Sequence, residues 1–135
     1  MDKFYFTPVG YVRSSFENRA QAPRQGRDAS VEVEIEILPR YAVALDGIAQ
    51  WSLLLVICWL HLADRDTLVV HPRGDLDSPL TGVFGTRSSS RPNPIAVYTV
   101  DFLSMEGNLL HVRGIDAVDG TPVLDIKPYI HRLDD

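Results

Sequence analysis

The sequence predicts a small, mainly β protein: a single-sheet antiparallel β-barrel with one short helix. Three observations favour this fold class. Short segments rich in β-branched and aromatic residues alternate with turn-rich stretches, residues 31–37 alternate strictly between apolar and acidic side chains, and no β-α-β unit repeats along the chain. A closed barrel leaves no unpaired edge, which suits one domain covering residues 1–135.

The first half of the chain supplies strands, a long loop and the helix. Residues 4–13 predict a strand, and residues 14–30 predict a polar loop of a length that is often functional. The alternation at 31–37 predicts a strand with one buried and one solvated face. Residues 39–45 predict the short helix, with a proline in its first turn and Gly47 ending it. The apolar residues 51–62 fit a helix or a doubly buried strand, and their β-branched and tryptophan content favours the strand.

The second half contains further segments with strand character. They cover residues 67–71, 82–86, 95–105, 109–117 and 123–130. Residues 106–108 predict a hairpin turn, and residues 72–79 and 88–94 predict loops. The N-terminus does not resemble a signal peptide and the longest apolar run is too short to span a bilayer, so we expect a cytoplasmic protein without membrane contact.

Composition and charge exclude several classes of protein. The chain is 45% hydrophobic and 23% charged with a net charge of −5, so any contact with nucleic acid must use a local basic patch. Its single cysteine, Cys58, lies in an apolar run and is expected to be a buried hydrophobe. The four histidines are scattered, so no metal site is predicted. Motifs of the G-x-G-x-x-G and G-x-S-x-G kinds are absent, which disfavours a Rossmann-type methyltransferase and a serine hydrolase.

Four places could hold chemistry, and each also has a plain structural explanation. Residues 82–94 place two arginines, several hydroxyls and a proline-flanked asparagine in a rigid loop, and residues 119–122 (Asp-Gly-Thr-Pro) form either a turn or a backbone edge for adenine or ribose. Residues 23–26 offer Pro-Arg-Gln-Gly in the long early loop. Asp125 and Lys127 face the same side of a strand, either as an ion pair or with Lys127 meeting a ligand carboxylate.

Taken together and in order, these segments resemble the TsaA-like (TrmO) family from end to end. The matching motifs lie at residues 8–14 (Pro-Val-Gly-Tyr-Val-Arg-Ser), 23–25 (Pro-Arg-Gln), 82–88 (Gly-Val-Phe-Gly-Thr-Arg-Ser), 91–95 (Arg-Pro-Asn-Pro-Ile) and 118–129 (Val-Asp-Gly-Thr-Pro-Val-Leu-Asp-Ile-Lys-Pro-Tyr). The resemblance implies a homodimeric single-sheet barrel that binds S-adenosylmethionine and N-methylates threonylcarbamoyladenosine beside the anticodon of certain tRNAs.

The resemblance also implies a set of site residues. The cofactor-binding residues would be Arg24, Gln25, Gly26, His61, Leu62, Arg87, Arg91, Asn93, Val97, Val118, Asp119, Gly120 and Thr121. Substrate would be held by Arg87, Arg91 and Lys127. His61, Asp119 and Tyr129 are candidates for the group that accepts the proton released by the methyl acceptor.

The chain departs from the family pattern in two places. Residues 51–55 (Trp-Ser-Leu-Leu-Leu) lack a histidine common there, and Ala96 replaces a frequent glycine. We also expect no extra C-terminal domain of the kind that longer members of the family carry. These departures and the acidic net charge keep two alternatives open. One is a methyltransferase acting on a small molecule, and the other is a non-catalytic module that binds S-adenosylmethionine.

Overall fold

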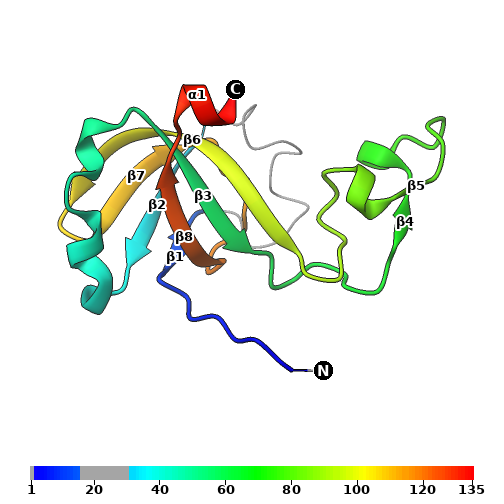
Figure 1. Ribbon diagram of the computed structural model, residues 1–135, viewed down its shortest axis with the longest axis horizontal. Coiled ribbons are helices and arrows are strands. Elements are labelled where there is room, and N and C mark those ends of the chain that lie inside the picture. The colour runs from blue at the N-terminus through cyan, green and yellow to red at the C-terminus, as the bar shows by residue number, and fades with distance from the viewer. Residues whose placement is uncertain (1, 16–30) are drawn as a thin grey trace.

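In a computed structural model that describes residues 2–15 and 31–135, six strands close into one antiparallel barrel, which confirms the predicted fold class (Figure 1). The order of strands around the barrel is β1-β2-β7-β6-β3-β8. They are β1 (Gly10–Arg13), β2 (Glu32–Ile37), β3 (Leu53–Trp59), β6 (Ile95–Glu106), β7 (Leu109–Arg113) and β8 (Pro122–Pro128). Two further short strands, β4 (Val69–Val70) and β5 (Thr81–Gly82), pair with each other outside the barrel.

The alternation of side chains along β2 and β3 builds the core. Val33, Ile35 and Ile37 of β2 are buried, while its glutamates point outward and Glu36 pairs with Arg13 of β1 at 3.0 Å. The apolar segment that fitted either a helix or a strand is the strand β3, with Leu54, Val56 and Cys58 facing the core. Cys58 is therefore the buried hydrophobe that the sequence predicts.

The helices are short and mostly of the 3-10 type. The helix predicted at residues 39–45 is present as the 3-10 helix η2 (Pro39–Leu45), and η3 (Ile48–Gln50) follows it before β3. Two further 3-10 turns each follow one strand of the β4–β5 pair: η4 (Pro72–Gly74) comes after β4, and η5 (Val83–Gly85) comes after β5. Within the described ranges the one α-helix is α1 (His131–Asp134), a C-terminal turn that the sequence analysis did not predict.

Several predicted strands are shorter than expected, among them the one expected at 67–71, of which only Val69–Val70 (β4) is a strand. The strand expected at 4–13 begins at Gly10. Pro8 has no N–H to donate to a neighbouring strand, and the chain before it leaves the barrel. The ring of Phe6 packs instead 5.2 Å from that of Trp59. The strand expected at 82–86 ends at Gly82, where η5 begins. The strand expected at 109–117 ends at Arg113, because Gly114 adopts a φ of 120° that redirects the chain.

The long connections of the barrel share one end, which we call the loop end. It is the end at which β1, β3 and β7 finish and β2, β6 and β8 begin, as the pairings of Glu32 with Arg113, Trp59 with Ile95 and Cys58 with Val123 show. The β3–β6 connection (residues 60–94) and the β7–β8 connection (114–121) both leave from it. The connection between β1 and β2 also starts and finishes there. The opposite end holds η2, η3 and the tight β6–β7 turn.

Candidate functional site

The loop end brings together most of the predicted site residues. His61 and Leu62 follow β3, Asn93 directly precedes β6, and residues 118–121 directly precede β8. These three places adjoin because β3 pairs with both β6 and β8. Arg24, Gln25 and Gly26 lie outside the described residues, in the connection between β1 and β2.

The Asp-Gly-Thr turn is fixed rigidly against β1. Thr121 is 1% exposed, and its hydroxyl donates to the carbonyl oxygen of Val118 at 2.7 Å. Gly120, with a left-handed φ of 83°, donates its N–H to the carbonyl of Val12 at 2.8 Å. One carboxylate oxygen of Asp119 accepts the backbone N–H of Ser14 at 3.1 Å. The other oxygen of this exposed carboxylate has no partner among the described residues, so Asp119 can still meet a ligand.

The two arginines of the central loop hold different positions. The Nη1 of half-buried Arg91 donates to the carbonyl oxygens of Thr86 and Ser88 at 3.1 and 2.9 Å, and its guanidinium lies 6.0 Å from the centre of the Phe84 ring. Arg91 therefore shapes its own loop. Arg87 is exposed, and its one hydrogen bond to a described residue, from Nη2 to the carbonyl oxygen of Val97 in β6, is long at 3.5 Å.

A third arginine, Arg65, lies at the same place and was missed by the sequence analysis. Its Nε donates to the carbonyl oxygen of Pro92 at 2.7 Å, and its Nη2 donates to Oδ1 of Asn93 at 3.4 Å. Its guanidinium also lies 5.1 Å from the centre of the Trp59 ring. No local motif indicates this contact, because it arises only when β3 and β6 pair and bring residues 59–65 beside residues 92–95.

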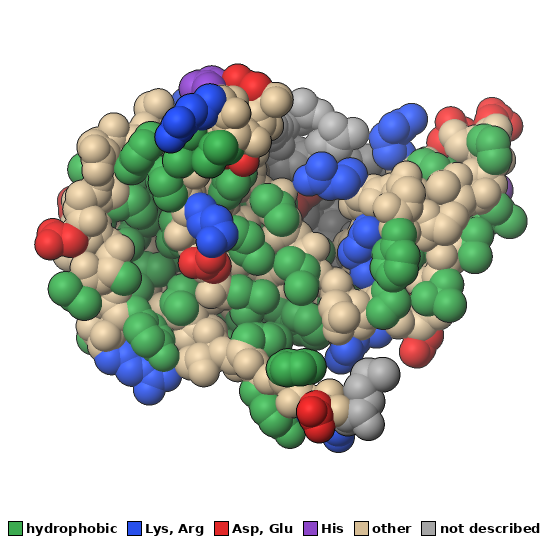
Figure 2. Space-filling model, viewed as in Figure 1, with side chains coloured by type: hydrophobic (Ala, Val, Ile, Leu, Met, Phe, Trp, Pro, Cys, Tyr) green, Lys and Arg blue, Asp and Glu red, His purple; other side chains and the backbone are tan. Residues whose placement is uncertain are grey.

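The charges of these three arginines are not neutralised by described carboxylates. The ion pairs of the described ranges involve Arg13, Arg113, Lys127 and two histidines. The acidic residues Asp64 and Asp75 accept hydrogen bonds from their own neighbours instead. The hydrogen bond from the Thr67 hydroxyl is the largest cause of a lowered pKa at Asp64, and hydrogen bonds from two backbone N–H groups lower it further. On the face seen in Figure 2, Lys and Arg side chains gather where the barrel meets the β3–β6 connection. This end of the barrel can therefore attract an anion.

Two predicted residues are not brought to the loop end. Lys127 lies on the outer face of β8, where its ammonium pairs with the Asp125 carboxylate at 3.1 Å, so the ion pair proposed as one alternative is present. The hydroxyl of Tyr129 donates to Asp135, and its backbone N–H donates to Leu53 at the start of β3. His61 follows the other end of β3, so the length of that strand, ~20 Å, separates it from Tyr129.

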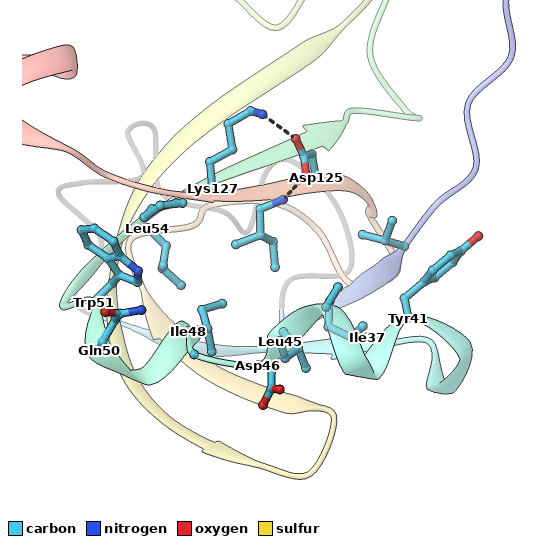
Figure 3. Close-up of a pocket in the computed structure, with 15 residues that line it drawn as sticks. Ile37, Tyr41, Leu45, Asp46, Ile48, Gln50, Trp51, Leu54, Asp125 and Lys127 are labelled. Carbon is cyan, nitrogen blue, oxygen red and sulfur yellow. Dashed lines mark hydrogen bonds and ion pairs between the residues drawn. The ribbon is translucent and has the colours of Figure 1, made fainter.

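A pocket of about 270 Å³ lies away from the loop end, between η2, η3 and β8 (Figure 3). Its walls are largely apolar and include Leu45, Ile48, Trp51 and Leu54. Of the predicted site residues only Lys127 lines it. The pocket is thus separate from the gathered arginines and from the Asp-Gly-Thr turn.

The described residues contain neither a group of three side chains that could hold a metal ion nor a helix long and apolar enough to cross a membrane. What they do contain is a rigid barrel with un-neutralised arginines and a fixed Asp-Gly-Thr turn at one end. These features define a β-barrel domain with a positively charged surface outside the ends of its strands.

Comparison with known proteins identifies the family. The model of the tRNA-methyltransferase O N-terminal domain matches residues 11–135, and the chain belongs to this family. It is 50% identical over 127 residues to a protein of Methanothermobacter thermautotrophicus named "Probable S-adenosyl-L-methionine-binding protein", covering 94% of this chain and 90% of that one. It is 45% identical over 127 residues, with the same two coverages, to an Archaeoglobus fulgidus protein named "S-adenosyl-L-methionine-binding protein".

Solved structures agree with the family. A crystal structure of TrmO superposes with a TM-score of 0.82 at 35% identity, covering 98% of this chain and 60% of that one. The structure of TrmO from Pseudomonas aeruginosa gives a TM-score of 0.79 at 34% identity, covering 98% of this chain and 58% of that one. The chain therefore spans about three fifths of the solved TrmO chains, whereas it spans most of the two archaeal relatives.

Proposed function

We propose that this protein is an S-adenosylmethionine-dependent methyltransferase that N-methylates threonylcarbamoyladenosine next to the anticodon of tRNA. The observation that carries the proposal is the grouping of Arg65, Arg87 and Arg91 at the loop end without a described carboxylate partner. Membership of the tRNA-methyltransferase O family supports the reaction, and the names of the two archaeal relatives support the cofactor.

The residues at the loop end fit the chemistry of S-adenosylmethionine. Its carboxylate suits an arginine, since a guanidinium can donate two parallel hydrogen bonds to a carboxylate. Its adenine needs apolar surface, and Leu62 and Val97 are 58% and 45% exposed beside the arginines. Hydrogen bonds restrain the backbone of residues 118–121, so its polar groups can bind the edge of a base in a fixed orientation. Arg24, Gln25 and Gly26 remain part of the proposed cofactor site.

In the proposed mechanism the protein chiefly positions the two reactants. When bound, S-adenosylmethionine supplies a methyl group that is already activated on a sulfonium. Arg87 and Arg91 hold anionic groups, either a substrate phosphate, the threonyl carboxylate or the carboxylate of the cofactor's methionine portion. The acceptor nitrogen must lose its proton, and Asp119 and His61 are the candidates at the loop end that can take it. Tyr129, at the other end of β3, is left out of this role.

We further propose that the protein is a homodimer formed through the outer faces of β3 and β6. Outward side chains on β3 are apolar (Leu53, Leu55 and Ile57), and the neighbouring Ile95 of β6 is 45% exposed. Figure 2 shows this apolar surface facing the viewer, interrupted by adjacent basic and acidic side chains. An exposed apolar face on the outside of a small barrel favours burial against a second copy.

The proposed reaction is tested with the purified protein, labelled S-adenosylmethionine and tRNA from a strain that lacks the enzyme. Label in tRNA carrying threonylcarbamoyladenosine, with none in the same tRNA made without that modification, supports the proposal. Label only in small metabolites favours the small-molecule methyltransferase, for which the net charge of −5 is an argument. Binding of the cofactor without any transfer favours the non-catalytic module.

A further inference from the structure

Arg65 is an exposed residue that is nevertheless held on three sides. Its Nε donates to the Pro92 carbonyl at 2.7 Å, its Nη2 donates to Oδ1 of Asn93 at 3.4 Å, and its guanidinium lies over the Trp59 ring at 5.1 Å. A long charged side chain on the surface normally samples many rotamers. Three simultaneous contacts therefore fix the guanidinium beside the Asn93 amide.

This contact determines which way the Asn93 amide points. An amide carries one acceptor oxygen and two donor hydrogens, while a guanidinium has donors only and cannot accept. A hydrogen bond between them requires the amide oxygen to face Arg65, so the NH₂ group of Asn93 must face away from it. The identity of the partner thus settles an orientation that the shape of the amide alone leaves ambiguous.

The backbone beneath Asn93 is equally restrained. Pro92 and Pro94 flank it and limit its backbone angles, Pro94 is fully buried, and the carbonyl oxygen of Asn93 accepts the N–H of Ile95 at 2.7 Å. The side chain itself is exposed, and its NH₂ donates to no described residue. Asn93 therefore presents two oriented donors to solvent at the loop end.

We propose that Arg65 is a positioning residue: it turns the Asn93 amide so that its NH₂ group donates to an anionic oxygen of the bound ligand. The NH₂ group of Asn93 is a hydrogen-bond donor, so its partner on the ligand must be an acceptor and not an amino group. The nearby positive charge of Arg65 favours an anionic acceptor over a neutral one. The inference rests on the proposed function for the identity of that oxygen. It comes either from the carboxylate of S-adenosylmethionine or from the threonyl carboxylate or a phosphate of tRNA.

The first test is Asn93→Asp, which keeps the size of the side chain but replaces the two donors with a negative charge. Arg65 can pair with the new carboxylate, so the fold should be retained, and the melting temperature checks this. If the oxygen belongs to the cofactor, the Kd for S-adenosylmethionine by calorimetry rises at least about tenfold. If it belongs to tRNA, that Kd is unchanged and the KM for tRNA rises instead. Unchanged Kd and KM overturn the proposal.

The second test separates positioning by Arg65 from a direct contact or a purely structural role. Arg65→Met keeps the aliphatic stem over Trp59 and removes the donors. We expect Arg65→Met to raise the same constant that Asn93→Asp raises, either the Kd for S-adenosylmethionine or the KM for tRNA. The rise should be about tenfold in the wild-type background and less than about twofold in an Asn93→Ala background, because coupled residues give non-additive effects. Equal effects in the two backgrounds contradict the proposal.

Arg65→Lys, which keeps the charge but not the planar fork, is the second variant in case Arg65→Met does not fold, and the same comparison applies to it. Measurements on the wild-type protein separate a failure of the proposed function from a failure of the role proposed for Arg65. A wild-type protein that neither binds the cofactor nor methylates tRNA removes the proposed function itself. An active wild-type protein with unaffected Asn93 variants removes only the role of Arg65 and Asn93.

Discussion

The carboxylate of Asp119 accepts the backbone N–H of Ser14 at 3.1 Å, across 105 residues of sequence. The contact fastens the turn before β8 to the end of β1, at the loop end of the barrel. One carboxylate oxygen of Asp119 thus has a structural role, while the other has no partner among the described residues, so a structural and a chemical role can be separated by mutation.

Asp119→Asn should leave the melting temperature unchanged and reduce methyl transfer at least about a hundredfold. The amide oxygen still accepts the Ser14 N–H, but an amide cannot take a proton from the methyl acceptor. The rate is measured with labelled S-adenosylmethionine and tRNA. The matched variant Asp119→Ala loses the hydrogen bond as well and should cost about 1 kcal/mol of stability. Full transfer by Asp119→Asn would leave His61 as the candidate base.

Arg91→Ala should lower kcat/KM for transfer at least about tenfold, or about 1.4 kcal/mol of transition-state stabilisation. The loss combines the missing charge with a loosened loop, because Nη1 of Arg91 also holds the carbonyls of Thr86 and Ser88. Arg87→Ala isolates the charge, since among the described residues Arg87 has one long hydrogen bond, to Val97. Wild-type turnover in both variants would show that neither guanidinium holds substrate or cofactor.

Gly10→Ala should destabilise the barrel by roughly 1–3 kcal/mol, measured by chemical denaturation. A Cβ at Gly10 would lie 2.3 Å from the backbone carbonyl oxygen of Glu36, so β1 and β2 would have to move apart. Gly85→Ala is the control, because its Cβ would meet only the Thr81 Cγ2 at an ordinary 3.4 Å. Equal stability of the two variants would mean that the β1–β2 spacing adjusts without cost.

Cys58 should not react with a thiol reagent at pH 8 while the protein is folded. Burial, with a smaller effect from the Asp116 charge, raises the pKa of its thiol from 9.0 to about 12. Because the folded protein holds the proton more tightly than the unfolded chain, the corresponding stability is complete below pH 9.0 and is lost as the pH rises towards about 12.

Denaturant melts across that pH range check the effect. A Cys58→Val variant, which has no thiol, should lose less stability between pH 9.0 and about 12 than the wild type. Rapid labelling of the native protein at pH 8, or parallel pH curves for the two proteins, would contradict the assigned burial.

Ile95→Glu should convert the proposed homodimer into a monomer, because it places a charge in the apolar face of β3 and β6. Light scattering after gel filtration measures the mass. Val31→Glu is the matched control: Val31 is 41% exposed, close to the 45% of Ile95, but lies beside β2. A wild-type protein that is monomeric at micromolar concentration would remove the dimer proposal.

The local sequence pattern predicts strands in which apolar and polar side chains alternate, because that alternation itself defines a buried and a solvated face. Val33, Ile35 and Ile37 alternate with glutamates, and that alternation defines the strand and its inner face. Residues 4–9 have equally good strand composition, yet β1 begins only at Gly10, because a strand also needs a partner and Phe6 packs on Trp59 instead.

The candidate site divides in the same way. The motif residues Arg87, Arg91 and Asp119 could be selected from sequence because their own segments are distinctive. Arg65 could not, since its contacts with Pro92 and Asn93 exist only after β3 and β6 have paired in register. The position of Lys127 relative to the loop end likewise depends on how the strand β8 lies in the closed barrel.

The β3–β6 connection leaves and re-enters the barrel at adjacent positions: Trp59 lies opposite Ile95, and Leu60 donates its N–H to Pro94 at 2.8 Å. Residues 60–94 therefore form an insertion whose two ends are held side by side by the pairing of β3 with β6. Doubling the length of such a segment costs only about 0.6 kcal/mol in loop-closure entropy. Residues within it can be replaced, lengthened or exchanged between related barrels while the β3–β6 register stays the same, so ligand selectivity can diverge without redesign of the core.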